Sequence, residues 1–121
     1  MDENSVKIRL IPELEEISDS DFQERVWVDN SVPGKRSSYD ECIEEFMEIS
    51  RSLLAELDEN EPEPPETRAL RELYHHIKEF HMNFACKENL ADDEKSLIVH
   101  PEWIKIQKEA ASLFHFLKQM Y

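Results

Sequence analysis

The chain has 121 residues, the length of one domain, and carries 28 acidic residues against 14 Lys and Arg, a formal net charge of −14. So negative a charge argues against direct binding to DNA, RNA or anionic lipid, because Lys and Arg are the residues that bind phosphate groups. A single Gly also excludes a Gly-rich phosphate-binding loop. We therefore expect residues 1–121 to form one domain that binds neither nucleic acid nor a membrane.

The sequence is typical of a cytoplasmic protein. Its first residues lack the basic segment and apolar run of a signal peptide, and no apolar stretch approaches the roughly 20 residues that span a bilayer. Two cysteines, Cys42 and Cys86, are too few for a disulfide scaffold. We expect Cys42 to pack as a thiol on the apolar face of a helix.

Residues 1–38 form the ambiguous part of the sequence, and we expect them to cover one side of the fold. The segment 6–10 alternates apolar and polar residues, which favours a short strand or extended segment. Asp19 supplies a start signal for a short helix that ends near Val28. The segment 25–28 would equally fit a strand paired with 6–10, but the start signal makes a short helix the favoured prediction.

The first long helix is predicted over about 39–58. Ser38 and Glu41 have the spacing of a capping box, in which the Ser38 hydroxyl accepts a hydrogen bond from a free amide and Glu41 reaches back. The apolar stripe follows the helical period of roughly 100° per residue. Its residues are Tyr39, Cys42, Ile43, Phe46, Ser50, Leu53, Leu54 and Leu57.

A connector rich in Pro and Glu, residues 59–66, ends this helix because proline has no amide to donate and biases the preceding residue away from helix. A second helix is predicted over about 66–85 and a third over about 101–120, where Pro101 suits the first turn. Together these elements predict a mainly α fold. It is a small bundle of three long amphipathic helices, completed by a short helix or extended segment at the N-terminus.

The acidic excess belongs to one half of the chain. Residues 1–66 contain 20 acids and 6 bases, whereas residues 67–121 contain 8 of each. On the first long helix Arg51 is the one basic residue among the acids. Like charges one turn apart destabilise a helix by about 0.2–0.5 kcal/mol per pair, so stability alone does not favour this arrangement. Two interpretations remain open, a solvated face and a surface for a basic partner. The acids opposite the apolar stripe are Asp40, Glu41, Glu44, Glu45, Glu48 and Glu56.

A partner surface also needs apolar anchors beside its charges. The candidates are Trp27, Tyr39, Ile104 and Phe116, and each of them also fits the core. Trp27 fits the core least well because charged residues surround it in the sequence. Ile104 and Phe116 lie off the apolar stripe of the third helix, so either this helix is buried on more than one side or the two residues belong to a contact surface.

No motif for catalysis or metal binding stands out. On a helical projection His75, His76 and His81 point in different directions, and they do not supply the converging ligands that zinc needs. Glu72 and His75 have the i,i+3 spacing of di-iron bundles, but a second copy of that motif is missing. We interpret His81 as a structural histidine and predict no enzyme activity, cofactor or metal.

These observations favour a non-enzymatic module that binds a basic protein through its acidic face. The most concrete version is an immunity or inhibitor protein of a bacterial toxin nuclease, since a nuclease needs a cationic channel for phosphates. The alternative is a structural or adaptor protein that forms a homodimer through the third helix. A further alternative is a nucleic-acid mimic that blocks a DNA-binding protein, and a small metal-dependent enzyme ranks last.

Overall fold

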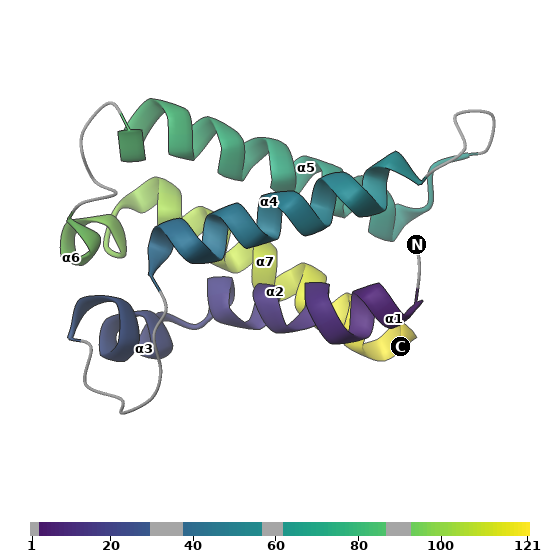
Figure 1. Ribbon diagram of the computed structural model, residues 1–121, viewed down its shortest axis with the longest axis horizontal. Helices are drawn as coiled ribbons and strands as arrows, with labels where there is room; N and C mark the ends of the chain where they lie inside the picture. Colours follow the sequence, from purple (N-terminus) through teal and green to yellow (C-terminus); the bar gives the residue numbers. More distant parts are fainter. Residues whose placement is uncertain (1–2, 30–37, 57–61, 87–92) are drawn as a thin grey trace.

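The computed structural model describes residues 3–29, 38–56, 62–86 and 93–121, and its helices run along the long axis of the molecule (Figure 1). The described part contains helices and no strand, which confirms the mainly α prediction. The helices are α1 (Glu3–Ser5), α2 (Ile11–Ser18), α3 (Ser20–Phe22), α4 (Tyr39–Ala55), α5 (Pro65–Phe80), α6 (Glu94–Leu97) and α7 (Pro101–Met120). Three wider π-helical segments continue them: η1 (Val6–Leu10), η2 (Gln23–Val28) and η3 (His81–Cys86).

The N-terminal segment is helical, so the expectation of a strand or extended segment over 6–10 is wrong. Helix α1 continues through η1 into α2 without a break. The alternation misled because only Val6 and Leu10, one helical turn apart, are buried, whereas Ile8 between them is 73% exposed. Burial therefore follows the helical spacing, and this segment adds to the three long helices that the periodicity predicted.

The short helix after Asp19 is confirmed, and a strand over 25–28 is excluded. The Asp19 carboxylate accepts a hydrogen bond from the amide of Phe22 at 3.0 Å, which caps α3 at its N-terminus. Helix α3 then continues as η2 as far as Val28. The capping signal at Asp19 therefore identified this short helix correctly, although residues 25–28 taken alone fit a strand as well as a helix.

Helices α4 and α7 begin where the sequence predicts, and α5 begins at Pro65, one residue before the expected bound. Ser38 accepts a hydrogen bond from the Glu41 amide at 3.3 Å, and prolines occupy the first turns of α5 and α7. Helix α4 ends at Ala55, three residues before the expected bound. The first part of the expected connector 59–66 lies outside the described residues, and residues 62–64 are not helical, but Pro65 and Glu66 already belong to α5.

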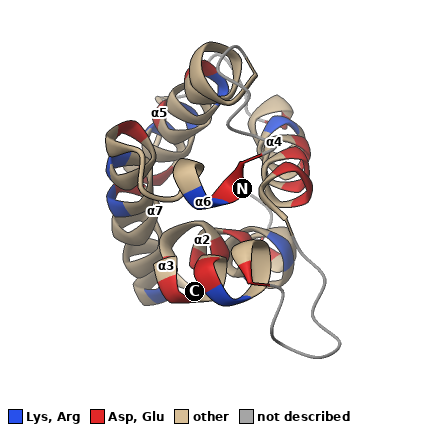
Figure 2. Ribbon diagram, turned by 90° about the vertical axis from the view of Figure 1, so that its left-hand side faces the viewer, with Lys and Arg blue, Asp and Glu red and all other residues tan. Residues whose placement is uncertain are grey.

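Four of the helices pack as a bundle around one core. Helix α7 packs against α2 and α5, and α4 packs against α5 and α2. Figure 2 views the bundle along its length and shows α4 on the opposite side from α7. Ring packing strengthens one end of the core, where Tyr39 lies 5.5 Å from Trp103 and 6.3 Å from Phe80 between ring centroids. As predicted, Cys42 is a buried free thiol on the inner face of α4.

Gln23 connects the N-terminal segment to α7. Its side-chain amide donates to the carbonyl oxygens of Glu16 and Ile17 at 2.8 and 2.7 Å. Its carbonyl oxygen accepts hydrogen bonds from the indole of Trp103 at 3.0 Å and from Gln107 at 2.7 Å. The fully buried side chain of Gln23 therefore has its hydrogen bonds satisfied, as buried amides must to avoid a desolvation cost.

None of the described helices is long and apolar enough to cross a membrane.

Candidate functional site

The acidic residues of the first long helix form one exposed surface, which we call the acidic face. Figure 2 shows acidic residues gathered on the side of α4 that points away from the rest of the bundle, whereas α5 and α7 carry both signs of charge. No Lys or Arg of the described ranges forms an ion pair with this face. The acidic face comprises Asp40, Glu41, Glu44, Glu45, Glu48 and Glu56, all of them exposed.

A further carboxylate lies at the beginning of the acidic face. Glu94 of α6 accepts a hydrogen bond from the amide of Tyr39 at 3.4 Å. Burial raises the pKa of Glu94, and the nearby charges of Asp40 and Glu41 raise it further, although the hydrogen bond from Tyr39 opposes them. Asp40 and Glu41 therefore act in the same direction as the burial of Glu94.

The expectation that Trp27 is a surface anchor is wrong. Trp27 is only 6% exposed and packs against the rings of Tyr39 and Trp103 at centroid distances of 6.1 and 6.0 Å. Its indole N–H donates to the Glu16 carboxylate at 3.2 Å, so the polar atom of the ring is satisfied inside the protein. Tyr39 is also fully buried. Both aromatic side chains belong to the core because helices far away in sequence cover them.

Ile104 and Phe116 are the two apolar candidates that remain at the surface, with exposed fractions of 38% and 40%. Phe116 lines a shallow hollow between α5 and α7, together with Pro65 and Ala69. Since α7 lies across the bundle from α4, neither residue joins the acidic face. The structure thus brings the predicted acids together but separates them from the predicted apolar anchors.

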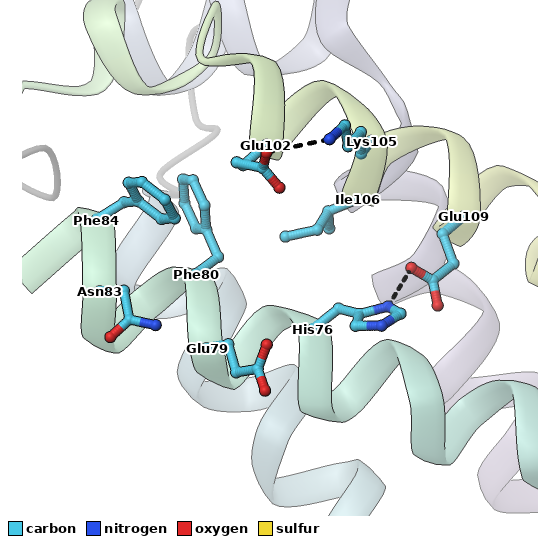
Figure 3. Close-up of a pocket in the computed structure, with 9 residues that line it drawn as sticks. All are labelled: His76, Glu79, Phe80, Asn83, Phe84, Glu102, Lys105, Ile106 and Glu109. Carbon is cyan, nitrogen blue, oxygen red and sulfur yellow. Dashed lines mark hydrogen bonds and ion pairs between the residues drawn. The ribbon is translucent and has the colours of Figure 1, made fainter.

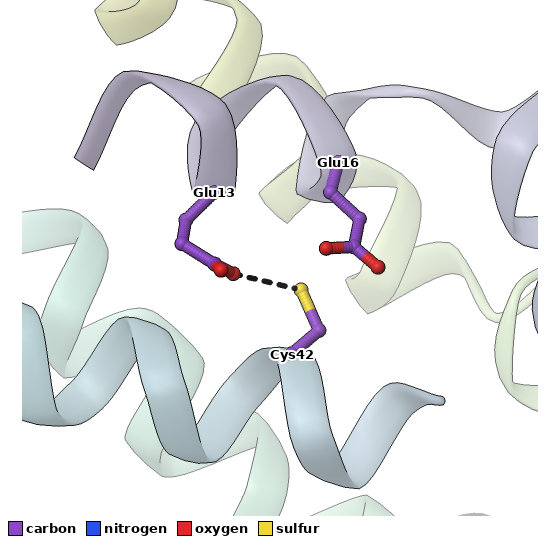
Figure 4. A group of neighbouring side chains, drawn as sticks. All are labelled: Glu13, Glu16 and Cys42. Atoms are coloured by element: carbon purple, nitrogen blue, oxygen red, sulfur yellow. Dashed lines mark hydrogen bonds between the residues drawn. The ribbon is translucent and has the colours of Figure 1, made fainter. Parts of the chain in front are cut away.

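Two carboxylates and a thiol meet between α2 and α4. Figure 4 shows Glu13, Glu16 and Cys42 directed toward one another. The thiol of Cys42 donates to the Glu13 carboxyl at 3.5 Å. One ligand atom each of Glu13, Glu16 and Cys42 lies within 4.8 Å of the others, a donor set of two carboxylates and a thiol that a divalent ion such as zinc accepts. This group was not singled out from the sequence because no helix was assigned to residues 11–18, so the i,i+3 spacing of Glu13 and Glu16 was not evident.

Protonation explains how this group tolerates burial. Burial raises the pKa of Glu13 to about 8, and a hydrogen bond to Glu45 and the charges of Glu45 and Glu16 act in the same direction. Burial also raises the pKa of Cys42. Glu13 is therefore a neutral acid at pH 7 and Cys42 is a thiol, so the group links α2 to α4 through hydrogen bonds without burying several negative charges.

The histidines do not converge. His81 is a structural histidine, as predicted: its Nδ1 lies 3.0 Å from the Tyr39 hydroxyl, and its Nε2 lies 3.5 Å from the Cys86 sulfur. Glu72 and His75 are both exposed on α5.

Comparisons with models of protein families, with curated proteins and with solved structures found no match to this chain.

Proposed function

We propose that this protein is a non-enzymatic binding module of the cytoplasm whose acidic face binds a basic protein. The observation that supports this function most is the set of exposed carboxylates on α4, which have no cationic partners within the described segments. Such a surface attracts a basic partner over a long range and is repelled by nucleic acid and anionic lipid. Helices α5 and α7 carry both signs of charge, so acidity is not a general need of this fold (Figure 2).

The partner that fits this surface best is a toxin nuclease, and the protein would then be its immunity or inhibitor protein. A nuclease holds phosphates with a cluster of Lys and Arg. A row of carboxylates on a rigid helix can neutralise that cluster and cover the substrate channel. A nucleic-acid mimic would use the same carboxylates against a DNA-binding protein, and competition by duplex DNA for the captured partner separates that version from inhibition of a nuclease.

Charge reversal on the acidic face tests the proposal. The variant replaces Glu41, Glu44 and Glu48 by Lys and leaves Glu45 intact, because Glu45 is hydrogen-bonded to the buried Glu13. We expect affinity for the captured basic protein to fall at least about tenfold, mainly through slower association. The partner is first captured from a lysate of the native host by the unmodified protein, and its nuclease activity is then titrated with each variant.

A matched control changes the same number of charges elsewhere. Glu15, Glu24 and Glu72 are exposed and lie outside the acidic face, and their replacement by Lys changes the net charge equally. We expect this control to keep its affinity, with the helical circular dichroism of all three proteins unchanged. Equal binding by the control and by the acidic-face variant would contradict the proposal.

A second candidate function rests on the exposed apolar side chains of α7. Ile104 and Phe116 favour a homodimer in which two copies of α7 cover each other. We expect Phe116→Asp to convert such a dimer to a monomer, as measured by light scattering. A monomer at high protein concentration without the substitution would eliminate this candidate and leave the acidic face unaffected.

A further inference from the structure

A cavity of about 370 Å³ opens between α5, η3 and α7, away from the acidic face on α4 (Figure 3). This volume falls within the range of about 300–1,000 Å³ that small-molecule sites occupy. The side chains that line the cavity come from α5 with its continuation η3 and from α7, and Figure 3 shows Phe80, Phe84 and Ile106 directed into the space between them. Neither the acidic face nor the group around Cys42 contributes to it.

The inner wall of the cavity is aromatic and apolar. Phe80 and Phe84 are stacked, with ring centroids 5.7 Å apart and an interplanar angle of 29°. Ile106 of α7 faces the two rings across the cavity (Figure 3). Phe80 is only 2% exposed and packs on Trp103, so the half-buried ring of Phe84 supplies most of the aromatic surface that a ligand can contact.

The rim of the cavity is acidic. Its three carboxylates belong to Glu79, Glu102 and Glu109. Lys105 Nζ lies 3.1 Å from Glu102, and His76 Nδ1 lies 2.7 Å from Glu109, so two of the carboxylates have partners inside the protein.

Glu79 is the rim carboxylate that remains available to a ligand. It is exposed and has no hydrogen bond or ion pair with any residue that the structure describes. Asn83, one turn further along, also lines the cavity and forms no hydrogen bond within the same part of the chain. The lining therefore keeps a negative excess whether His76 is neutral or charged, because three carboxylates face at most two cations.

We propose that this cavity binds a small organic cation with an apolar body, such as an ammonium or guanidinium group attached to an aromatic ring. The body lies against Phe84, and the cationic group donates hydrogen bonds to the Glu79 carboxylate and to the side-chain oxygen of Asn83. A carboxylate ligand is repelled by the rim, and a neutral ligand gains only the apolar contact. This inference does not depend on the proposed function, because the acidic face lies on another helix.

Three probes of matched shape test the charge requirement: 2-phenylethylamine, 2-phenylethanol and 3-phenylpropionate. Each is titrated into the full-length protein at pH 7 and followed by two-dimensional amide NMR. We expect the amine to bind most tightly, the alcohol more weakly and the carboxylate least, with shifts concentrated in residues 76–84 and 102–109. Absence of these shifts with the amine, or an affinity for the carboxylate equal to that for the amine, would overturn the proposal.

A pair of single substitutions tests the role of Glu79. Glu79→Gln removes the available carboxylate from an exposed position, and we expect the affinity for the amine to fall by about fivefold while that for the alcohol stays unchanged. Glu24→Gln removes the same charge from an exposed position outside both the cavity and the acidic face and serves as the control, with no change expected. An equal loss in both variants would show that only the overall charge attracts the amine, which also overturns the proposal.

Discussion

The two faces of α4 carry acidic groups in opposite states. On the outer face Glu41, Glu44 and Glu48 are exposed and lie one turn apart without cationic partners. On the inner face Glu13 reaches α4 from α2, is 8% exposed and is held neutral by burial and by Glu45. The same side-chain type therefore supplies exposed carboxylates on one face and a buried, uncharged hydrogen-bonding group on the other. Solvent access decides which of the two it becomes.

Truncating the inner face should cause the largest change. Phe46 is fully buried on α4, and Phe46→Ala is expected to lower the free energy of unfolding by about 3–5 kcal/mol through lost apolar contact and a residual cavity. Glu48→Ala on the outer face of the same helix should change it by less than about 0.5 kcal/mol. Urea unfolding of the two variants provides the measurement, and similar losses would contradict this division of α4 into a core face and a surface face.

The buried carboxyl group should make stability depend on pH. The pKa of Glu13 rises from 4.5 to about 8 on folding, so the folded state holds a proton that the unfolded state releases. The contribution of Glu13 is therefore fully present below pH 4.5 and is lost as pH rises through 8, by at most about 1.4 kcal/mol per pH unit.

Glu13→Gln tests this pH dependence because the amide resembles the protonated acid. Its carbonyl oxygen can still accept from Cys42, and its amide can still donate to Glu45. We expect the variant to gain stability relative to the unmodified protein as pH rises from 5 to 8, as measured by thermal unfolding across that range. A constant difference between the two proteins over this range would show that Glu13 ionises normally.

Loss of the cap at the start of α4 should have an intermediate effect. Ser38→Ala removes the acceptor for the Glu41 amide and is expected to cost about 1 kcal/mol. Ser38→Asp keeps an acceptor at this position and provides the matched comparison. Chemical unfolding should place the Asp variant close to the unmodified protein, and equal destabilisation by Ala and Asp would argue that the hydroxyl does not act as a cap.

Relief of like-charge repulsion on the outer face should give the smallest effect and the opposite sign. Glu44 lies one turn from Glu41 and from Glu48. In Glu44→Lys the loss of each like-charge pair is expected to raise the free energy of unfolding by about 0.2–0.5 kcal/mol. We expect a slightly higher melting temperature together with weaker binding to a basic partner. Loss of stability in this variant would mean that the acids of α4 are needed for folding rather than for binding.

Local chemistry made much of the fold predictable from the sequence. The caps at Ser38 and Asp19 and the apolar period of α4, α5 and α7 depend on residues close together in the chain. Segment 6–10 was misjudged because three apolar residues at alternate positions fit a strand and a helix equally well. Ile8 faces solvent because η1 and α2 pack their other sides against α4 and α7.

The candidate sites were predictable only where they lie on a single helix. The acidic face could be located from the sequence because all its members follow one helical projection. The burial of Trp27, the meeting of Glu13 with Cys42 and the cavity beside Phe84 each depend on elements that are distant in the chain. The periodicity of a single helix does not indicate where a distant helix packs against it, so these contacts could not be predicted from the sequence.

The hydrogen bonds of Gln23 give the bundle a defined register. Both of its donors and both acceptor positions of its carbonyl oxygen are used, and they connect residues of α2 and α7 through one side chain. Sliding α7 by one turn would leave the buried Gln23 amide and the Trp103 indole without these partners, whereas apolar contact has no such directional requirement. Gln23 therefore favours this placement of α7 against α2 over one shifted by a turn.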